Sequence, residues 1–470
     1  MSLLLPAWPN AAYAAHQEEG VNWMCAHEHH GYQVNSDCKV HGGILGDEMG
    51  LGKTIQALGL IVNSPVKSTL IVMPLAVRKQ WEEAVKRTGC LNLYTADATW
   101  TAHGKVKPSR KTVFLGHYDK IVSTPEMFQD MGFDRIILDE AHRIRNMKNV
   151  TSRNVHAIPA LYKWVLTATP IVNTLDDAVS YLKFIGFPVE SNSWNPMYET
   201  WVKNIYLART IEQCEAPAGL VMPPTPILET RYLDFTNKDE EKLYSGIYSN
   251  LENQWRQAAH KGRAGSLQKL SILLRLRQVS VNPQVYIRAR QKEAFGWAGP
   301  EFTSVSRKFA EIETLLRASH TNGVSNRWII FCQFHEEIAM MTSFLKGLPA
   351  VGSVLEYHGG MSFSDRDEAI AASHVKSSGG KQDVFLVQLQ AGGTGLNLQH
   401  YDRVIFTSPW WTAALLDQAI GRAVRIGQAA VVKVYWLKLK TEDLFNIDAF
   451  MMDKADEKRD LGKLFLSWSI

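Results

Sequence analysis

The sequence is poor in cysteine and has no apolar run long enough to cross a membrane. Only five cysteines are scattered over its 470 residues. An odd, scattered set of thiols argues against a disulfide-stabilised secreted protein. The first nine residues also lack the basic leader of a signal peptide. We therefore expect an intracellular protein that does not bind membranes, nuclear in a eukaryote and cytoplasmic in a prokaryote or a virus.

The sequence also lacks a strong excess of charge of either sign. It has 51 basic and 47 acidic residues, a net charge of +4. That balance neither requires nor excludes a nucleic-acid partner, because binding depends on where basic groups cluster. Apolar residues make up 46% of the chain, which excludes wholesale disorder. The length favours two or three domains.

Short apolar runs alternate with helical stretches in both the first half and the last third of the chain. Strands that alternate with helices predict crossover units and a parallel sheet. The sequence therefore predicts an α/β protein with two parallel-sheet lobes. The expected strands are 43–45, 69–73, 113–115, 135–138 and 164–166 in the first lobe, and 328–332, 353–357, 384–387, 403–406 and 432–436 in the second.

The middle of the chain differs from both lobes. From 237 to about 290 its apolar residues recur at helical spacing. We interpret this stretch as a helical insertion between the lobes. The predicted domains are a first lobe at 1–228, the insertion at 229–300, a second lobe at 301–440 and a helical tail at 441–470.

A glycine-rich loop, Gly46–Thr54, follows the first expected strand and precedes a helical run. Gly50 and Gly52 allow the backbone to curl so that its N–H groups face a polyphosphate. Lys53 can reach the β- and γ-phosphates, and Thr54 can offer its hydroxyl to Mg²⁺. An ordinary glycine-rich turn would not need this strand–loop–helix setting, so we predict an ATP site.

An acidic pair, Asp139-Glu140, directly follows another apolar strand and begins the run Asp-Glu-Ala-His. Carboxylates at the carboxyl end of a strand can lie beside a phosphate loop in a parallel sheet. We predict that Asp139 holds Mg²⁺ and that Glu140 orients and polarises the attacking water. A surface turn with two acids is the alternative if the loop and the pair do not meet.

Two further motifs indicate a function only in combination with the phosphate loop and the acidic pair. Thr167 and Thr169 follow a third strand and can relay the state of the γ-phosphate to a nucleic-acid surface, although an ordinary strand-ending turn explains them better when they are taken alone. Arg422 and Arg425 lie far along the chain, one helical turn apart, which predicts a shared helix face. Guanidinium groups suit the charge that develops during phosphoryl transfer. Isolated, the two would be solvated arginines.

In this order, the motifs resemble those of the Swi/Snf-type ATPases of helicase superfamily two. The resemblance runs from about His16 to Trp436. Asp47, which breaks the general phosphate-loop pattern, is part of the family's own version. The resemblance implies that Gln17 reads adenine and that Gly395 and Gln418 contact the nucleotide. It also assigns Thr394 to coupling with nucleic acid.

This resemblance implies two RecA-like lobes and DNA-stimulated ATP hydrolysis with Mg²⁺. It further implies translocation along double-stranded DNA by a monomeric motor, which remodels DNA structure or protein–DNA complexes and meets other proteins there. A strand-separating DNA or RNA helicase is the alternative, and a catalytically dead docking module is a second. The chain departs from the family at Ala168, Val424 and Ser280–Pro283, but none of these changes removes a catalytic charge.

Three weaker features leave alternatives open. The basic block 251–292 either lines the duplex path or forms a solvated face. A group of cysteines and histidines at 25–41 is interpreted as a mobile loop with reduced thiols, with a zinc site as the alternative. The tail at 448–468 predicts an amphipathic helix that packs back onto a lobe, with a partner-binding helix as the alternative.

Overall fold

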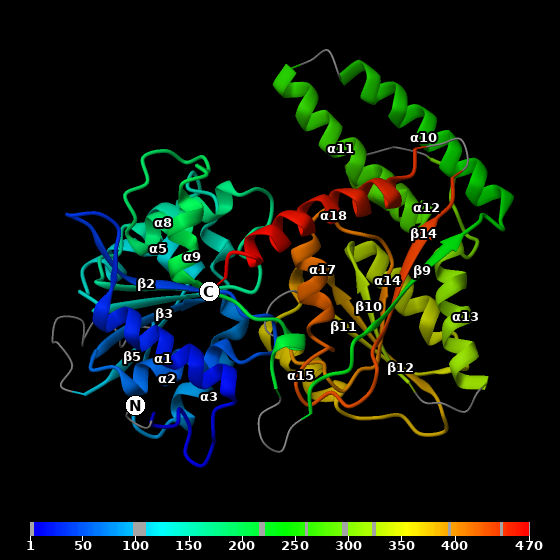
Figure 1. Ribbon diagram of the computed structural model, residues 1–470. Helices are drawn as coiled ribbons and strands as arrows, with labels where there is room; N and C mark the ends of the chain where they lie inside the picture. The colour runs from blue at the N-terminus through cyan, green and yellow to red at the C-terminus, as the bar shows by residue number, and fades with distance from the viewer. Residues whose placement is uncertain are drawn as a thin grey trace. The chain divides into compact units, whose positions relative to one another are not determined.

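The computed structural model forms two compact units, each with its own parallel sheet (Figure 1). It describes residues 4–96, 110–215, 221–258, 262–293, 299–321, 326–392, 396–441 and 445–469. The first unit comprises 1–222, 425–427 and 457–470, and the second comprises 223–424 and 428–456.

The sheet of the first unit has the strand order β1-β2-β7-β6-β3-β5-β4, with β8 beside β2. Apart from the antiparallel pair β1–β2, its strands run parallel. The strands are β1 (Tyr32–Gln33), β2 (Lys39–Leu45), β3 (Ser68–Met73), β4 (Asn92–Thr95), β5 (Thr112–His117), β6 (Arg135–Asp139), β7 (Tyr162–Leu166) and β8 (Tyr206–Leu207).

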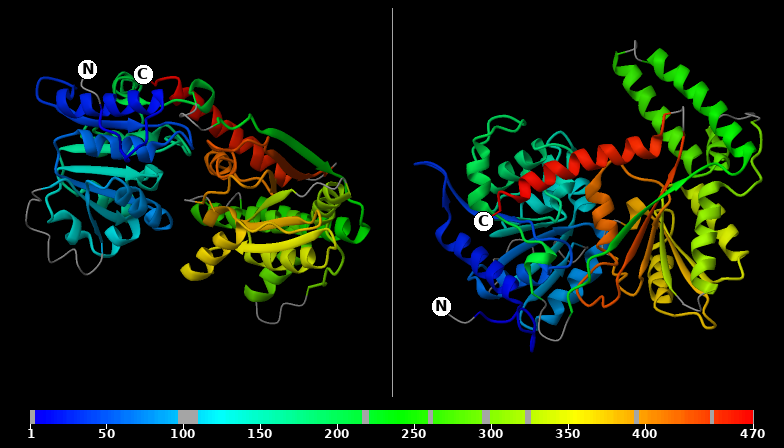
Figure 2. Two further views of the ribbon diagram at one scale, coloured as in Figure 1. Left: turned by 90° about the horizontal axis from the view of Figure 1, so that it is seen from below. Right: turned by 45° about the vertical axis from the view of Figure 1, so that its right-hand side comes forward.

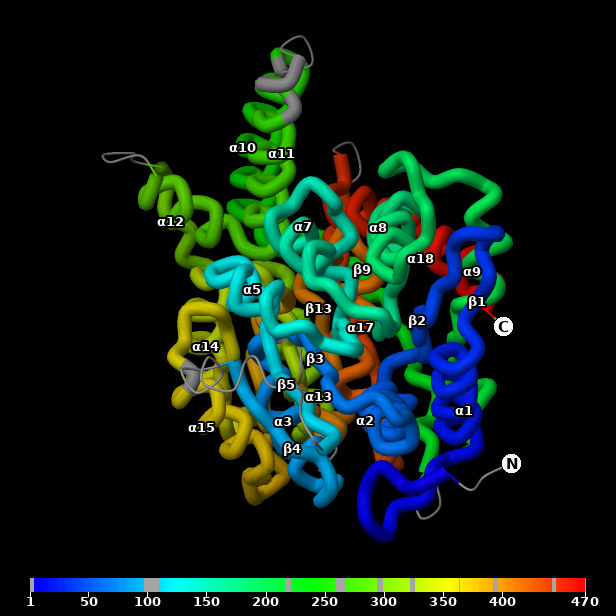
Figure 3. Tube along the Cα trace, turned by 90° about the vertical axis from the view of Figure 1, so that its left-hand side faces the viewer, coloured from blue at the N-terminus to red at the C-terminus, as the bar shows by residue number. Residues whose placement is uncertain are grey.

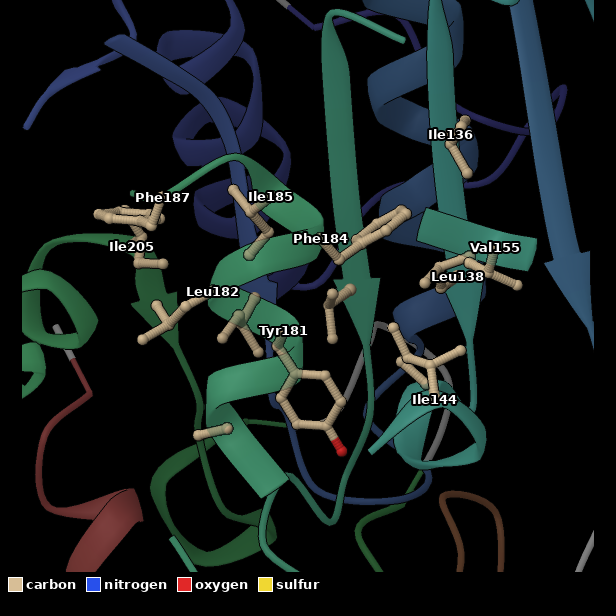
Figure 4. Packing of buried hydrophobic residues seen from close by; sticks show 14 of the residues in the cluster. Ile136, Leu138, Ile144, Val155, Tyr181, Leu182, Phe184, Ile185, Phe187 and Ile205 are labelled. Atoms are coloured by element: carbon tan, nitrogen blue, oxygen red, sulfur yellow. The ribbon is translucent and has the colours of Figure 1, made fainter. Parts of the chain in front are cut away.

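Helices cover both faces of this sheet. One face packs Ile136 and Leu138 against Tyr181 and Phe184 of α8 (Figure 4), and the other packs against α2 and α3. Helices α1 and α2 lie side by side (Figure 3). The helices are α1 (Ala15–His30), α2 (Lys53–Asn63), α3 (Arg78–Arg87), α5 (Tyr118–Ser123), α6 (Pro125–Gln129), α7 (Val150–His156), α8 (Asp176–Ile185) and α9 (Tyr198–Ile205).

The second unit has an all-parallel sheet in the order β11-β12-β10-β13-β14-β9, with helices on both faces (Figure 2). Its strands are β9 (Ile227–Leu233), β10 (Arg327–Cys332), β11 (Val351–Tyr357), β12 (Gln382–Gln388), β13 (Arg403–Phe406) and β14 (Lys433–Leu439). Its helices are α10 (Lys238–Ala258), α11 (Gly262–Val281), α12 (Pro283–Glu293), α13 (Arg307–Thr321), α14 (His335–Lys346), α15 (Phe363–Ser373), α16 (Leu389–Gly392) and α17 (Ala413–Ile420).

All ten strands expected from the sequence are present. Most are buried apolar runs between polar or glycine-rich turns, whereas β11 is only partly buried over most of its length. Where the sequence predicted a helical insertion, the structure has helices α10, α11 and α12, which belong to the second unit. The sequence did not predict β9, which pairs with β14 although it stands before the insertion in the chain. Strand β9 is largely exposed, so it lacks the apolar signal of the others.

The tail forms helix α18 (Ile447–Leu466), as expected. Met451 packs into a core of the second unit, and Phe465 and Trp468 pack into a core of the first. Trp468 stacks on Trp194 with 5.4 Å between ring centroids. Apolar side chains along the helix therefore pack into the cores of their own units.

The interpretation of 25–41 as a mobile loop is wrong. Cys25 and His27 lie in α1, and Cys38 lies in the turn between β1 and β2. All five cysteines are free thiols. In the part of the chain that the structure describes, no cluster of three or more His, Cys, Asp or Glu side chains is arranged to hold a metal, nor has any helix there the length and apolar content of a membrane span.

Candidate nucleotide site

Three neighbouring strands of the first sheet bring the predicted motifs to one edge. Strands β2, β7 and β6 are adjacent and parallel, so their carboxyl ends meet there. The phosphate loop follows β2, the Thr167–Thr169 turn follows β7, and the acidic pair Asp139-Glu140 ends β6. The backbone N–H of Thr167 donates to the Leu45 carbonyl over 3.1 Å, which ties two of these loops together.

The phosphate loop has the backbone that the sequence predicted. Gly50 has φ +97° and Gly52 has φ +84°, a region that side-chain-bearing residues avoid. Gly52 precedes α2, and no side chain caps the amino end of this helix. Free N–H groups at a helix amino terminus attract anions. The loop and α2 therefore form a cradle suited to phosphate groups.

Lys53 begins α2 and points back along the loop. Its Nζ donates to the Asp47 carbonyl over 2.6 Å. Burial lowers the pKa of the Lys53 ammonium, and the carboxylates of Glu140, Asp47 and Asp139 oppose that shift. The cation thus lies in the field of the acidic pair. Thr54 follows in the first turn of α2, partly exposed.

Asp139 is held by two aromatic residues that the sequence analysis missed. The indole Nε1 of Trp81 donates to Asp139 Oδ2 over 2.8 Å. The Tyr118 hydroxyl donates to the Asp139 carbonyl over 2.8 Å. Burial and the neighbouring Glu140 carboxylate raise the pKa of Asp139 to about 6. The neighbouring carboxylate opposes ionisation of Asp139, and a bound cation would relieve that repulsion.

Glu140 adopts a left-handed backbone conformation, with φ +50° and ψ +50°. Among the described residues, Asn10 is the one other non-glycine residue with positive φ. Such backbone costs about 1–3 kcal/mol, and it concentrates at functional sites. The Glu140 Oε2 atom lies 3.3 Å from His142 Nδ1. The left-handed residue therefore follows β6 directly and is the second member of the acidic pair.

The residue predicted to read adenine lies against the phosphate loop. Gln17 is buried in α1, and its Nε2 donates to the Leu51 carbonyl over 3.2 Å. The neighbouring His16 Nε2 lies 2.9 Å from the same carbonyl. A Cβ on Gly52 would lie 2.6 Å from Gln17 Nε2, so glycine is needed there for space as well as for φ.

The remaining predicted residues belong to the later motifs. Gln418 is buried in α17. The predicted shared helix face of Arg422 and Arg425 is wrong, because α17 ends at Ile420 and both arginines lie in the turns that follow. The Arg422 carbonyl accepts a hydrogen bond from Leu398 N–H over 3.0 Å, which takes the acceptor that a continuing helix would use. Their meeting with the phosphate loop stays a prediction.

Two of the predicted residues, Thr394 and Gly395, lie outside the described residues.

Two arginines of the basic block 251–292 are buried in the second unit. Arg277 is buried, with its guanidinium carbon 4.3 Å from the ring centroid of Trp410. Arg275 is also buried and donates to Gln278 and Glu293. Because both guanidinium groups are buried, neither of these two arginines lines a DNA path.

Two family models match the chain in sequence order. The SNF2-related domain matches residues 16–285, more than half of the chain, and the helicase conserved C-terminal domain matches residues 307–427. The chain belongs to the SNF2-related family. Its two parallel-sheet units agree with the two RecA-like lobes that the resemblance implied. The resemblance drawn from the motifs is thereby confirmed.

Curated relatives are similar at low identity. DNA repair protein RAD5 of Candida albicans is 23% identical, covering 90% of this chain and 56% of the relative. A probable global transactivator of Orgyia pseudotsugata multicapsid polyhedrosis virus is 26% identical, covering 94% and 89%. ISWI chromatin-remodeling complex ATPase ISW1 of Saccharomyces cerevisiae is 24% identical, covering 98% and 41%. The chain thus spans about half the length of the first and less of the third.

Proposed function

We propose that this protein is a DNA-stimulated ATPase that couples ATP hydrolysis to translocation along double-stranded DNA and so remodels DNA structure or protein–DNA complexes. The observation that carries the proposal is the meeting of Lys53, Asp139 and Glu140 at one sheet edge beside a phosphate cradle. Membership of the SNF2-related family and the printed names of the relatives, a DNA repair protein and a chromatin-remodeling ATPase, support it.

The residues present fit ATP and Mg²⁺. The uncapped amino end of α2 and the positive-φ glycines offer N–H groups to phosphates. Asp139 and Thr54 supply the hard oxygen ligands that Mg²⁺ prefers. When bound, Mg²⁺ neutralises charge on the β- and γ-phosphates.

The chain's own residues then divide the work. Lys53 binds the terminal phosphates, and Trp81 holds the Asp139 carboxylate in one orientation. Glu140 orients a water molecule in line with the γ-phosphate and accepts its proton. Arg422 and Arg425 place positive charge on the transferring group, and Gln418, Gly395 and Gln17 hold the nucleotide. Thr167, Thr169 and Thr394 relay the phosphate state to the DNA-binding surface.

Phosphate release, titrated separately with duplex DNA, single-stranded DNA and RNA, tests this proposal. We expect duplex DNA to stimulate hydrolysis most. A triplex-displacement assay run beside a strand-displacement assay separates translocation from helicase action. Triplex displacement without strand separation supports a duplex translocase, and efficient strand separation contradicts it. We also propose that the motor acts as a monomer, meets other proteins on DNA, and works inside the cell, in the nucleus of a eukaryote.

A further inference from the structure

Asp47, in the first half of the phosphate loop, is fully buried although it carries a carboxylate. Its main partner is Arg209, which lies 162 positions later, just after β8. Arg209 Nε donates to Asp47 Oδ1 over 3.0 Å and Nη2 donates to Oδ2 over 2.7 Å. The Arg209 backbone N–H donates to Oδ1 as well, over 3.1 Å. Paired contacts of this kind fix both distance and orientation.

The same guanidinium reaches two further segments. Nη1 donates to the His16 carbonyl and lies 2.9 Å from Glu19 Oε2, both in the first turns of α1. Nη2 donates to Gln56 Oε1 in α2 over 3.0 Å, and Gln56 Nε2 donates to Asp47 Oδ2 over 2.8 Å. One side chain thus joins the start of α1, the phosphate loop and α2. We call these contacts of Arg209 the Arg209 clamp.

The backbone around Arg209 also supports the loop. Gly46 N–H donates to the Leu207 carbonyl over 2.7 Å, and Glu48 N–H donates to the Arg209 carbonyl over 2.8 Å. Ile211 N–H donates to Glu48 Oε2 over 2.7 Å. The pairing of β8 with β2 therefore continues along the first half of the loop. The segment after β8 therefore holds the backbone of the loop through hydrogen bonds.

The side chains of the Arg209 clamp pack closely against Gly20 of α1. A Cβ on Gly20 of α1 would lie 1.9 Å from Gln56 Oε1 and 2.9 Å from Arg209 Nη2. Glycine at this position lets α1 approach close enough for the contacts to form. The clamp therefore depends on the close packing of three segments that are distant in sequence.

We propose that Arg209 is a positioning residue that acts through Asp47 to hold the phosphate loop in its nucleotide-binding conformation. The inference deepens the proposed function and rests on it for the ligand, a nucleoside triphosphate. Arg209 supplies no group to the reaction. Its loss leaves a buried carboxylate without its main counter-charge, and such a group forces local rearrangement.

The test compares Arg209→Gln, Asp47→Asn and the double variant. Labelled ADP should bind about tenfold or more weakly to Arg209→Gln, because a buried charge loses its partner. Residues 46–54 should exchange backbone hydrogens faster in the same variant. The double variant should recover much of both properties, since no charge is left unpaired, and the two single effects should not add.

A matched control is Arg327→Gln. This arginine has the same 11% side-chain exposure as Arg209 and lies 4.0 Å from buried Asp383, in the second unit. It should lower the melting temperature without changing ADP affinity or exchange at 46–54. If Arg209→Gln does not fold, Arg209→Lys, which keeps one charged contact, replaces it and should give a smaller change in the same direction.

Two results would overturn the inference. One is a folded Arg209 variant with unchanged ADP affinity and unchanged exchange in the loop. The other is strict additivity in the double variant. A wild-type protein that does not hydrolyse ATP would instead refute the proposed function. Hydrogen exchange at 46–54 would still decide whether Arg209 positions the loop, because it needs no ligand.

Discussion

The two units treat buried charge differently at the carboxyl edges of their sheets. In the second unit, Lys308 Nζ bonds Asp448, Ser280 and the carbonyl of Thr407, which follows β13. Both members of this ion pair are completely buried. In the first unit, Asp139 lies beside a second carboxylate, and its pKa is raised to about 6. The buried cation of the second unit thus has a carboxylate partner, whereas the buried carboxylate of the first has a second carboxylate beside it.

This difference separates a charged pair that stabilises the fold from a pair that is placed to act in a reaction. A buried pair whose hydrogen bonds are all made stabilises the fold, and removing one partner destabilises it. Ionisable groups whose pKa is shifted by burial and by neighbouring charges are typical of functional sites. We therefore expect substitutions of the acidic pair itself to affect turnover with little loss of stability, and substitutions of the Lys308–Asp448 pair to do the reverse.

The largest expected effect is at Glu140. Glu140→Gln keeps the side-chain shape but cannot accept a proton, so we expect DNA-stimulated turnover to fall about 10³-fold. The melting temperature and DNA binding should stay near wild type. Phosphate release and a filter-binding assay measure the two properties. Glu199→Gln, in an exposed pair with Lys203, is the control. Normal hydrolysis by Glu140→Gln would mean that another group positions the water.

Arg425 tests whether the later motif serves the first edge. Arg425→Ala should lower kcat about 10²-fold or more with little change in KM, because its contact strengthens in the transition state. Steady-state kinetics with saturating duplex DNA measure both constants. Arg403→Ala, where Arg403 pairs with Asp402 at the amino end of β13, should leave them unchanged. A raised KM with normal kcat would instead assign Arg425 to nucleotide binding.

Lys308 tests the other half of the comparison. Lys308→Ala leaves Asp448 buried without its counter-ion, and we expect unfolding free energy to fall by about 3 kcal/mol or more. Urea denaturation followed by circular dichroism measures this. Lys440→Ala removes an exposed pair with Asp234 in the same unit and should cost about 0.5 kcal/mol or less. Equal losses in the two variants would show that the buried pair adds no special stability.

The strands and the phosphate loop were predictable because their signals are local. The apolar run Ile136–Leu138 and the glycines at 50 and 52 lie within a few residues of what they determine. Trp81 bonds a residue 58 positions away, and Arg209 one 162 positions away, so no spacing rule could find them. The shared helix face of Arg422 and Arg425 was predicted wrongly for the same reason, because the backbone N–H of the distant Leu398 donates to the Arg422 carbonyl.

Ser280 is an instructive case between these extremes. Its segment, Ser280–Pro283, departs from the family's usual sequence without removing a catalytic charge. In the structure, its hydroxyl bonds both Asp448 and Lys308 inside the second unit. The departure therefore lies beside the buried Lys308–Asp448 pair. The sequence showed that no catalytic charge is lost here, but it could not show which residues Ser280 contacts.

The smallest effect that still separates the two edges is at Trp81. Trp81→Phe removes the indole N–H that holds Asp139, and losing an outer contact of this kind costs about tenfold in turnover. Trp328→Phe is matched, because its indole N–H donates to Gln382 over 2.9 Å and the side chain is equally buried in the second unit. Both should lose about 1–2 kcal/mol of stability. If only Trp81→Phe slows hydrolysis, the first edge is set by the orientation of Asp139; if both do, the loss reflects general loosening of the protein.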